Sequence, residues 1–543
     1  MPSKSLLPAL DIPEADIVTF LFERNIPFPP NKDAETKQSY TFVQVKKTAQ
    51  ALGRALILHW NWPKGDVLAI FTPNCIDTPV ITFGTLWAAG VVSPVNPAYT
   101  VDELTAQLRN SAAKAIATQA AAKRVGIPDN SILLLGRNQT VTDGDSKHFW
   151  DLLRKDTGNI RLVPKNSRPK IDPKGDLAFL VYSSGTTGLP KGVMLSHTNI
   201  VTNILQIDSV DGRYLTWKRD SVLAFLPLFH IYGLTCHIHQ PLYAGYHTII
   251  MFCAYIQNYQ ITFSYVVPPV LLLLTKHPIV DKYRLSSLRM LHSGAVPLSR
   301  DLALATARRI NVPVKQGYGL SETSPVTHMQ LWDDWSKYFG SIGKLMPNME
   351  AKYRTIGIES SKSDSELEQL HEVPIGKIGE LYLRGPNIFQ GYYQQVKATS
   401  KCLSAEGWLS GRAWQLYITD RIKKLIKYKG SQVAPAELEG LLSYHKDVND
   451  VAVIGVDSPA RGTEVPRAYI VRTRSKDESF VSDEDCAAEI ICWLNFRVAQ
   501  HKRLRGGIRF VDAIPKSVSG KILRRTLRAQ AQKEADAVNQ ANL

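Results

Sequence analysis

A run of small hydroxyl and glycine residues, YSSGTTGLPKGVMLSH at residues 182–197, directly follows a short apolar segment with the composition of a buried strand. The glycines allow the backbone to approach a ligand closely, and the serine and threonine hydroxyls add donors beside the backbone N–H groups. A lysine near the end of the run supplies a positive charge. These features predict a phosphate-binding loop, and the residues expected to line it are Ser183, Ser184, Gly185, Thr186, Thr187, Gly188 and Lys191.

The loop fits neither of the two common nucleotide-binding templates. It contains no G-x-x-x-x-G-K-S/T sequence, and its glycines are not spaced as G-x-G-x-x-G after the strand. A mobile surface loop is the alternative interpretation, but the preceding apolar strand and the closing Pro190-Lys191-Gly192 disfavour it. We therefore expect a third kind of nucleotide-binding loop.

At 543 residues the chain is too long for a single hydrophobic core, so we expect two or more domains. Its 65 lysines and arginines against 49 acidic residues give a net charge of +16, which favours an anionic partner. Nucleic acid, an anionic membrane and a phosphate-rich cofactor are the candidates, and a solvated basic face is the simpler alternative. The basic clusters near the C-terminus lack the interleaved aromatic residues of a base-stacking platform, so we do not expect nucleic acid.

The six cysteines lie far apart and form no C-x-x-C pair, which disfavours both a disulfide framework and a zinc site. The longest apolar runs are too short or too interrupted to span a bilayer, and the N-terminus has no basic-then-apolar signal. We therefore expect an intracellular protein without a transmembrane segment, in the cytoplasm or in peroxisomes. The last residues, Ala541-Asn542-Leu543, are only a weak peroxisomal-type signal because the basic central residue is missing.

Apolar, strand-like segments alternate with helix-like stretches through most of the chain, which predicts a layered α/β fold. Examples are an amphipathic helix at residues 42–60 and a strand at residues 243–251. The sequence then becomes β-rich and glycine-punctuated before a strongly basic stretch that begins after Asp420. We place a domain boundary there, between residues 1–419 and 420–543.

Further motifs follow expected strand ends, where ligands bind in open α/β sheets. In FLPLFHIYGL, residues 225–234, a histidine and a tyrosine can wall a pocket, although the histidine alone also fits a structural role. In QGYGLSETSP, residues 316–325, a tyrosine between two glycines suits stacking on a purine. The adjacent Ser-Glu-Thr suits Mg²⁺ and phosphate, or alternatively the start of a capped helix. A glycine-hinged lysine segment, PKSVSGKILRR, completes the series at residues 515–525.

In their sequence and order these motifs resemble those of the adenylate-forming acyl-CoA synthetase superfamily, and within it the 4-coumarate-CoA-ligase-like acyl-CoA ligases of fungal secondary metabolism. The resemblance covers nearly the whole chain. It implies an α/β fold with a large N-terminal domain, built from two helix-flanked sheets and a small β-barrel, and a small mobile α+β C-terminal domain that hinges near Asp420. The implied cofactors and partners are ATP, Mg²⁺, CoA and a small carboxylic acid, while the oligomeric state stays open.

The resemblance also implies how ATP is held. The phosphate-binding loop would grip the β- and γ-phosphates, and adenine would stack on Tyr318 in a slot lined by Gly317 and Gly319. Ser321 looks like a contact of the α-phosphate. Thr186 and Glu322 are similar to Mg²⁺ ligands.

Other implied roles concern the acid and CoA. Lys521 resembles the lysine that bridges the substrate carboxylate and the α-phosphate, and His230 is a further catalytic candidate. The positions expected to face the acyl group are Tyr232, His292, Ala295, Pro325 and Val326. Those similar to residues near the ribose and the thioester-forming site are Arg421, Lys427 and Gln432.

The implied reaction is adenylation of a hydrophobic carboxylic acid, aryl or medium-chain, with release of pyrophosphate and then acyl transfer to CoA. The match fails after residues 407–409, where the family has Thr-Gly-Asp and this chain has Ser410-Gly411-Arg412, so the aspartate that would hold the ribose is absent. A second shortening is expected near residues 30–36. The alternatives left open are an inactive paralogue, acyl transfer to a carrier-protein thiol, and a nucleic-acid-binding protein that uses its basic C-terminal region.

Overall fold

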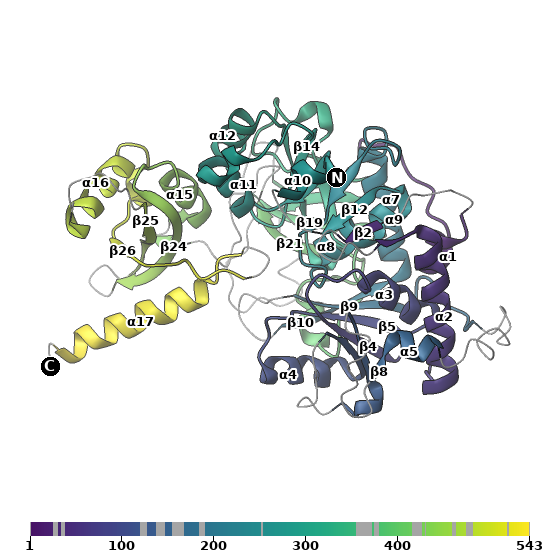
Figure 1. The fold of residues 1–543 in the computed structure, drawn as a ribbon. Helices are drawn as coiled ribbons and strands as arrows, with labels where there is room; N and C mark the ends of the chain where they lie inside the picture. The colour runs from purple at the N-terminus through teal and green to yellow at the C-terminus, as the bar shows by residue number, and fades with distance from the viewer. Residues whose placement is uncertain are drawn as a thin grey trace.

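The computed structural model of the chain is drawn as a ribbon in Figure 1. A large part runs from the N-terminus to β21, and a smaller part with helices α15, α16 and α17 lies to one side of it. The described residues are 2–24, 31–33, 39–119, 127–136, 147–154, 168–183, 190–250, 254–354, 372–373, 379–414, 426–428, 431–458, 463–473, 482–517 and 521–541.

The first sheet of the large part has the strand order β20-β10-β9-β5-β4-β6-β7-β8. Its central strands pair in parallel and are buried at successive positions, so both faces are covered. Helix α2 (Phe42–Trp60) packs against α3 (Thr78–Trp87) and starts at a capping box between Thr41 and Gln44. The remaining elements are β4 (Val67–Phe71), β5 (Val91–Val95), α4 (Val101–Ser111), β6 (Ala113–Thr118), β7 (Ile132–Leu134), β8 (Lys147–His148), α5 (Phe149–Arg154), β9 (Leu177–Ser183), β10 (Lys191–Ser196) and β20 (Gly391–Tyr392).

The second sheet has the order β17-β16-β15-β14-β13-β11-β12-β2-β3, and its strands from β15 to β2 run parallel. The carboxyl ends of those strands therefore lie along one edge, where ligands bind in such sheets. The strand bounds are β2 (Asn31–Asp33), β3 (Ser39–Tyr40), β11 (Ser221–Leu223), β12 (His247–Ile250), β13 (Phe263–Val266), β14 (Met290–Ser293), β15 (Val314–Gly319), β16 (Val326–Met329) and β17 (Lys344–Leu345).

Part of the strand expected at residues 243–251 is wrong. Tyr243 belongs to helix α9 (Gln240–Ala244), and the strand begins only at His247. Gly245 separates the two elements with φ 80°, a left-handed conformation that ends the helix and that glycine adopts without strain.

Helix α7 (His197–Asp211) joins the two sheets, because it contacts β10 of the first and β16 of the second. It is buried on nearly every side, as a helix between layers must be. Further helices of the large part are α1 (Ile17–Phe22), α8 (Ile231–Gly233), the π-helical turn η3 (Leu234–His239), α10 (Ala254–Tyr259), α11 (Pro268–Lys276), α12 (Arg300–Ile310), the 3₁₀ turn η5 (Ser321–Thr323) and α14 (Val396–Ser400).

A third, four-stranded antiparallel sheet lies in the β-rich part of the sequence. It comprises β1 (Ser3–Lys4), β18 (Glu350–Arg354), β19 (Glu380–Arg384) and β21 (Leu409–Trp414).

The smaller C-terminal part has hydrophobic clusters of its own and mixes helices with strands. Asp420 and Arg421, at the expected hinge, lie outside the described residues. Within the described residues no helix combines the length and the apolar character needed to cross a bilayer. The elements are β22 (Ile426–Tyr428), β23 (Ser431–Val433), α15 (Pro435–Leu442), β24 (Val448–Ser458), β25 (Thr463–Arg472), α16 (Asp483–Asn495), β26 (Ile508–Phe510) and α17 (Arg524–Ala541).

Candidate active site

The two ends of the expected phosphate-binding loop face each other across an antiparallel strand pair. Ser183 at the end of β9 pairs in register with Lys191 at the start of β10. The other expected loop residues, Ser184, Gly185, Thr186, Thr187 and Gly188, lie outside the described residues. Tyr182 anchors the entry to the loop, because its hydroxyl donates to Asn110 Oδ1 at 2.6 Å.

The second motif meets the first at this place. The turn η5, which holds Ser321 and Glu322, contacts both β9 and β10. Tyr392 connects the two motifs: the Lys191 ammonium lies 4.8 Å from the centroid of its ring, and its hydroxyl donates to Glu322 Oε1 at 2.7 Å. Burial and the Glu322 carboxylate raise the pKa of Tyr392, so the phenol stays a donor.

The sequence reasoning missed Tyr392. Its signal is the aromatic pair Tyr392-Tyr393 after a glycine, but the contact with Glu322 spans 70 positions of the chain. No local pattern predicts such a contact.

Hydrogen bonds from neighbouring side chains stabilise the turn around Glu322. Thr323 Oγ1 accepts the Leu320 N–H at 2.9 Å, as in a helix cap. Asn387 donates from Nδ2 to the Thr323 carbonyl oxygen at 2.8 Å. Its backbone carbonyl oxygen accepts a hydrogen bond from the Ser324 hydroxyl at 3.0 Å. Thr323 therefore performs the capping role that was the alternative interpretation of Ser-Glu-Thr.

Strand β15 leaves the buried core as it reaches the expected purine slot. Its residues are buried up to Gln316 and partly exposed at Gly317, Tyr318 and Gly319. A Cβ at Gly317 would lie 2.5 Å from Nε2 of His292, and one at Gly319 would overlap the Pro325 carbonyl oxygen. Both glycines are thus required by close packing as well as by any ligand.

The expected acyl pocket gathers at the ends of β14 and β15. Tyr232 donates from its hydroxyl to the His292 carbonyl oxygen at 3.0 Å, and its ring lies 6.5 Å from the His292 ring. A Cβ at Gly294 would lie 3.1 Å from the Tyr232 ring, so the ring packs tightly against the Gly294 backbone. Ala295 follows with φ 69°, a left-handed turn that ends the strand.

His230 lies at the start of α8, where its Nδ1 accepts the Tyr232 N–H at 3.2 Å. Since Nδ1 is the acceptor, the neutral ring carries its proton on Nε2.

Val326, which follows Pro325 in the chain, is positioned by helix α7. Asn203 accepts the Val326 N–H on Oδ1 at 3.1 Å and donates from Nδ2 to the Val326 carbonyl oxygen at 2.7 Å. Asn203 is fully buried, so these two hydrogen bonds fix the backbone at the pocket.

A buried ion pair lies next to the pocket and was not expected from the sequence. Lys315 pairs with His292 across β14 and β15 and forms a fully buried salt bridge with Asp211 of α7. Asp211 Oδ1 also accepts the indole N–H of Trp332 at 2.8 Å. Burial, and then the charge of Lys315, hold the pKa of His292 well below its ordinary value, so the imidazole in the pocket is neutral.

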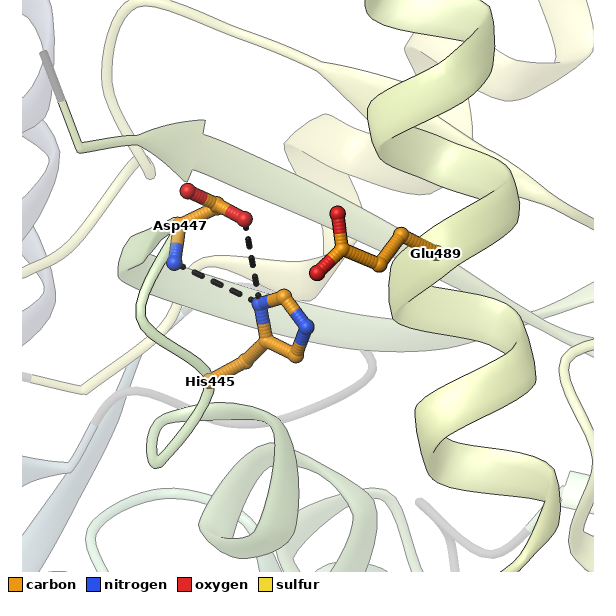
Figure 2. Close-up of side chains that lie close together, drawn as sticks. All are labelled: His445, Asp447 and Glu489. Carbon is orange, nitrogen blue, oxygen red and sulfur yellow. Dashed lines mark hydrogen bonds and ion pairs between the residues drawn. The ribbon is translucent and has the colours of Figure 1, made fainter. Parts of the chain in front are cut away.

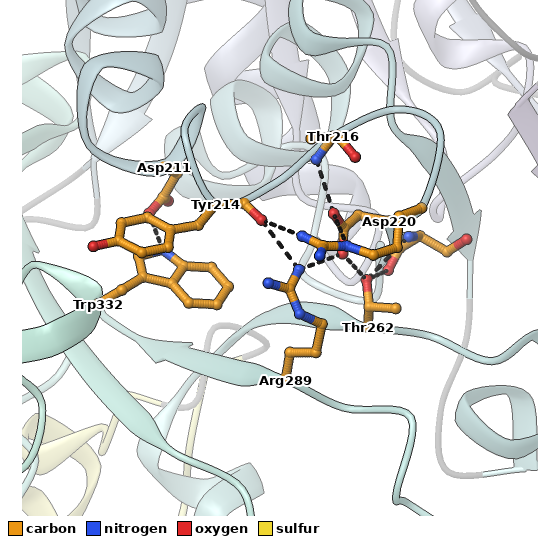
Figure 3. Close-up of polar contacts among 9 residues, drawn as sticks. Asp211, Tyr214, Thr216, Asp220, Thr262, Arg289 and Trp332 are labelled. Atoms are coloured by element: carbon orange, nitrogen blue, oxygen red, sulfur yellow. Dashed lines mark hydrogen bonds and ion pairs between the residues drawn. The ribbon is translucent and has the colours of Figure 1, made fainter.

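Figure 3 shows Asp211 with Trp332 and, beside them, a polar network around Asp220. The ring of Tyr214 stacks on Trp332 with centroids 4.9 Å apart. Asp220 accepts from Arg289 at 2.7 Å and from the Thr262 hydroxyl at 2.8 Å. These contacts tie the loop after α7 to β13 and β14, which carry one wall of the site.

Three of the expected residues of the C-terminal part lie in described segments: Lys521 beside an isolated antiparallel bridge, and Lys427 and Gln432 in a strand pair. The Ser517 N–H donates to the Lys521 carbonyl oxygen at 2.8 Å, and Lys521 N–H donates to Ser517 Oγ at 3.1 Å. Lys427 and Gln432 are partners in the β22–β23 pair.

His445, Asp447 and Glu489 form a separate cluster of possible metal ligands in the C-terminal part (Figure 2). His445 Nδ1 accepts the Asp447 N–H at 3.3 Å, which engages the lone pair that a metal would need. The Lys446 ammonium lies 3.8 Å from both carboxylates and supplies the positive charge. The described contacts therefore make the cluster a set of ion pairs between the turn after α15 and helix α16.

Comparisons with known proteins match both parts of the chain. The family model described as AMP-binding enzyme matches residues 22–393, and the model described as AMP-binding enzyme C-terminal domain matches residues 437–521. A probable 4-coumarate–CoA ligase 1 of Dictyostelium discoideum is 36% identical over 503 residues, covering 86% of this chain and 86% of the relative. A 4-coumarate–CoA ligase of Pinus taeda is 34% identical over 552 residues, covering 97% of each.

Among solved structures, an anthranilate CoA ligase in complex with anthranoyl-AMP superposes with a TM-score of 0.81 at 22% identity, covering 97% of this chain and 99% of that one. This likeness shows the fold. The family models and the identity to curated relatives show more: the chain belongs to the AMP-binding enzyme family and, within it, to the group of the 4-coumarate–CoA ligases, which are ATP-dependent acid–thiol ligases.

Proposed function

We propose that this chain adenylates a hydrophobic carboxylic acid, with an aromatic acid as the first choice, and then transfers the acyl group to CoA. The observation that carries the proposal is the meeting of two distant motifs, where Tyr392 connects Lys191 with Glu322 beside the slot at the end of β15. The relatives also support an aromatic acid as the substrate, since the names of two of them include the aromatic acids 4-coumarate and anthranilate.

ATP would lie along the edge where these motifs meet. The loop between Ser183 and Lys191 would hold the β- and γ-phosphates through backbone N–H groups, hydroxyls and the ammonium. Adenine would stack on Tyr318, and Ser321 would donate to the α-phosphate.

The residues present fit Mg²⁺, because a carboxylate oxygen is a ligand that this ion prefers and Tyr392 holds the Glu322 carboxylate in a fixed orientation. Mg²⁺ bound by Glu322, with Thr186 as a second ligand, would neutralise charge on the phosphates.

In the first step a carboxylate oxygen of the acid attacks the α-phosphorus of ATP, and the bond to the pyrophosphate oxygen breaks. Two anions approach each other, so positive groups must stabilise the charge that develops. Lys521 would bridge the substrate carboxylate and the α-phosphate, while Lys191 holds the leaving pyrophosphate.

In the second step the CoA sulfur attacks the acyl carbonyl carbon, AMP leaves and the thiol proton is released. The C-terminal part would turn about Asp420 between the steps, which withdraws Lys521 and brings Lys427 and Gln432 to the site, while Arg421 would contact the ribose. His230 would donate from Nε2 toward the reacting carbonyl group.

The acyl pocket proposed here has flat and uncharged walls. Tyr232 supplies an aromatic face, His292 a neutral imidazole, and Ala295 and Gly317 leave space. Pro325 and Val326 would close the far side. Such walls suit an aryl group better than a second carboxylate.

A weakly active or inactive paralogue is the second candidate, favoured by Ser410-Gly411-Arg412 in place of the ribose-binding Thr-Gly-Asp. The match to the Pinus taeda enzyme runs over 552 positions although this chain has 543 residues, so the relative has residues without a counterpart here. Loss of a charged contact to the ribose could weaken ATP binding by about 1.5–3 kcal/mol.

The test is pyrophosphate release from ATP with a panel of aromatic and medium-chain acids, followed by addition of CoA or of a phosphopantetheinyl carrier protein. We expect release with an aromatic acid and a thioester with CoA. No release with any acid would overturn the proposal. The double variant S410T/R412D separates the candidates, because a strong gain in ATP affinity would mark the natural sequence as impaired.

A further inference from the structure

The C-terminal part rests on the large part at a defined contact near helices α11, α12 and α15 (Figure 1). Lys276, the last residue of α11, donates from Nζ to the Val448 carbonyl oxygen at 2.7 Å. A Cβ at Gly440 of α15 would lie 3.3 Å from Cβ of Ser299, the N-cap of α12. We call these four residues the docking contact.

The docking contact is connected to one side of the segment that carries Lys521. Glu439, next to Gly440 on α15, accepts two hydrogen bonds from Arg524 at 2.6 and 2.7 Å. Its Oε1 also accepts the Val453 N–H at 2.7 Å. A bidentate arginine–carboxylate pair fixes orientation as well as distance, and this one is mostly buried.

The other side of the same segment is held through strand β24. Asp450, two residues after Val448, accepts from the Lys516 ammonium at 2.6 Å. Lys516 in turn bridges to Ile522 in an antiparallel pair. Lys516 and Arg524, on either side of Lys521 in the sequence, are thus fastened to the elements that dock on the large part.

Lys276 is the charged member of the docking contact. Its ammonium donates to a carbonyl oxygen, and charge-assisted hydrogen bonds are stronger than neutral ones. Burial lowers the pKa of Lys276, while the Asp450 carboxylate raises it, so the large part provides a cation beside an anion of the C-terminal part.

We propose that Lys276 is a positioning residue for Lys521, because its contact with Val448 stabilises one orientation of the C-terminal part and, through Lys516 and Arg524, the position of Lys521. This inference rests on the proposed function, in which Lys521 acts only in adenylation. The contact would therefore favour the first step, and its release would permit the second.

The first experiment measures the two steps separately on the full chain. Lys276→Met should slow pyrophosphate release by about tenfold, the weight of one charge-assisted hydrogen bond, and leave thioester formation from preformed acyl-adenylate and CoA unchanged or faster. Lys276→Arg keeps a cationic donor and should retain most of the first step. Lys282→Met is the matched control, since Lys282 is an exposed lysine six residues further along the chain.

The second experiment locks the orientation. The separation of the Cβ positions at Ser299 and Gly440 is close to the roughly 3.5–4.5 Å of a disulfide, so the double variant S299C/G440C should form one on oxidation. The oxidised variant should adenylate the acid but form thioester slowly until a reductant is added. In the oxidised triple variant with Lys276→Met, adenylation should recover, which a purely structural defect would not do.

The rate of disulfide formation in S299C/G440C is a readout that needs no enzymatic activity. Lys276→Met should slow it by about tenfold, and Lys282→Met should not. Equal rates with and without Lys276→Met would overturn the inference even if the chain proves inactive. Absence of pyrophosphate release in the wild type, with a changed rate of disulfide formation, would instead overturn only the proposed function.

Discussion

Gly317 shows how a single residue is constrained twice. It occupies the start of the expected purine slot, and the position that a Cβ would take lies 2.5 Å from Nε2 of His292 on the neighbouring strand. His292 is itself buried and cannot swing into solvent. The glycine therefore allows β14 and β15 to pair and at the same time leaves space beside Tyr318.

Gly317→Ala should destabilise the large part by about 1–3 kcal/mol, because the methyl group overlaps a buried imidazole. Pyrophosphate release should fall as well, since the strand end is displaced. Urea denaturation and the activity assay measure the two effects. The double variant Gly317→Ala/His292→Ala should recover stability, and a single variant as stable as wild type would contradict the overlap.

Tyr392→Phe keeps the ring near Lys191 but removes the donor to Glu322 Oε1. If this hydrogen bond orients the carboxylate for Mg²⁺, the KM for MgATP should rise by roughly tenfold, equal to about 1.4 kcal/mol, with little change in the KM for the acid. Tyr393→Phe alters the adjacent phenol and serves as the matched control. Equal KM values for MgATP in both variants would show that Tyr392 does not act through Glu322.

At the scale of elements, the sequence correctly predicts those helices and strands whose signals lie within one segment of the chain. The helix at residues 42–60 is confirmed with the same bounds, because its apolar periodicity and its Thr41–Gln44 capping box lie within one segment. The error at residues 243–251 has a related cause: an apolar run fits a buried helix and a buried strand equally well, and here Gly245 divides the two.

Contacts between distant elements could not be predicted in this way. The Lys315–Asp211 ion pair joins residues 104 positions apart, and a lysine inside an apolar strand gives no sign of its partner. Tyr392 and Glu322 are likewise joined only by the way β20 adds to the edge of the first sheet. The motifs thus predicted the residues at the strand ends, while the supports behind them required the fold.

Helix α7 contacts the first sheet and, through Asn203, fixes the backbone of Val326 in the second sheet. Asn203→Ala should cost about 1–3 kcal/mol of stability, because the buried Val326 N–H loses its side-chain acceptor while the Val326 carbonyl oxygen keeps the longer hydrogen bond from Asn387 at 3.3 Å. The KM for the acid should rise, since Val326 then loses its fixed position. Thr202→Val is the control: Thr202 is equally buried, and its hydroxyl has no hydrogen-bond partner within the described part of the chain. Similar losses in both variants would contradict a specific role of Asn203.

At the scale of the whole molecule, several histidines of the large part are buried. Burial lowers the pKa of His197 and His239 to about 4 and that of His237 and His328 to about 3. His292 shifts in the same direction. The folded chain thus keeps these rings neutral at a pH where the unfolded chain, with an ordinary histidine pKa near about 6.5, protonates them.

The sign of the pH dependence follows from that difference. Between about pH 4 and 6.5 the unfolded state binds more protons, so stability rises with pH and is lost as the pH falls, by up to about 1.4 kcal/mol per pH unit for each histidine. Asp208 opposes one of them, because burial raises its pKa to about 6 and the folded state then takes up a proton. Because the buried histidines outnumber Asp208, the net stability still falls as the pH decreases.

We therefore expect the urea midpoint to be nearly constant from pH 8 to 7 and to fall steeply from pH 6.5 to 5.5. His237→Phe is the variant that isolates one proton, because neither ring nitrogen of His237 has a hydrogen-bond partner among the described residues and a phenyl ring has a similar shape. Its stability should fall less steeply with decreasing pH, by about 1.4 kcal/mol per pH unit, while at pH 8 it stays close to wild type. Parallel curves for the two proteins would mean that His237 is protonated in the folded chain, against its burial.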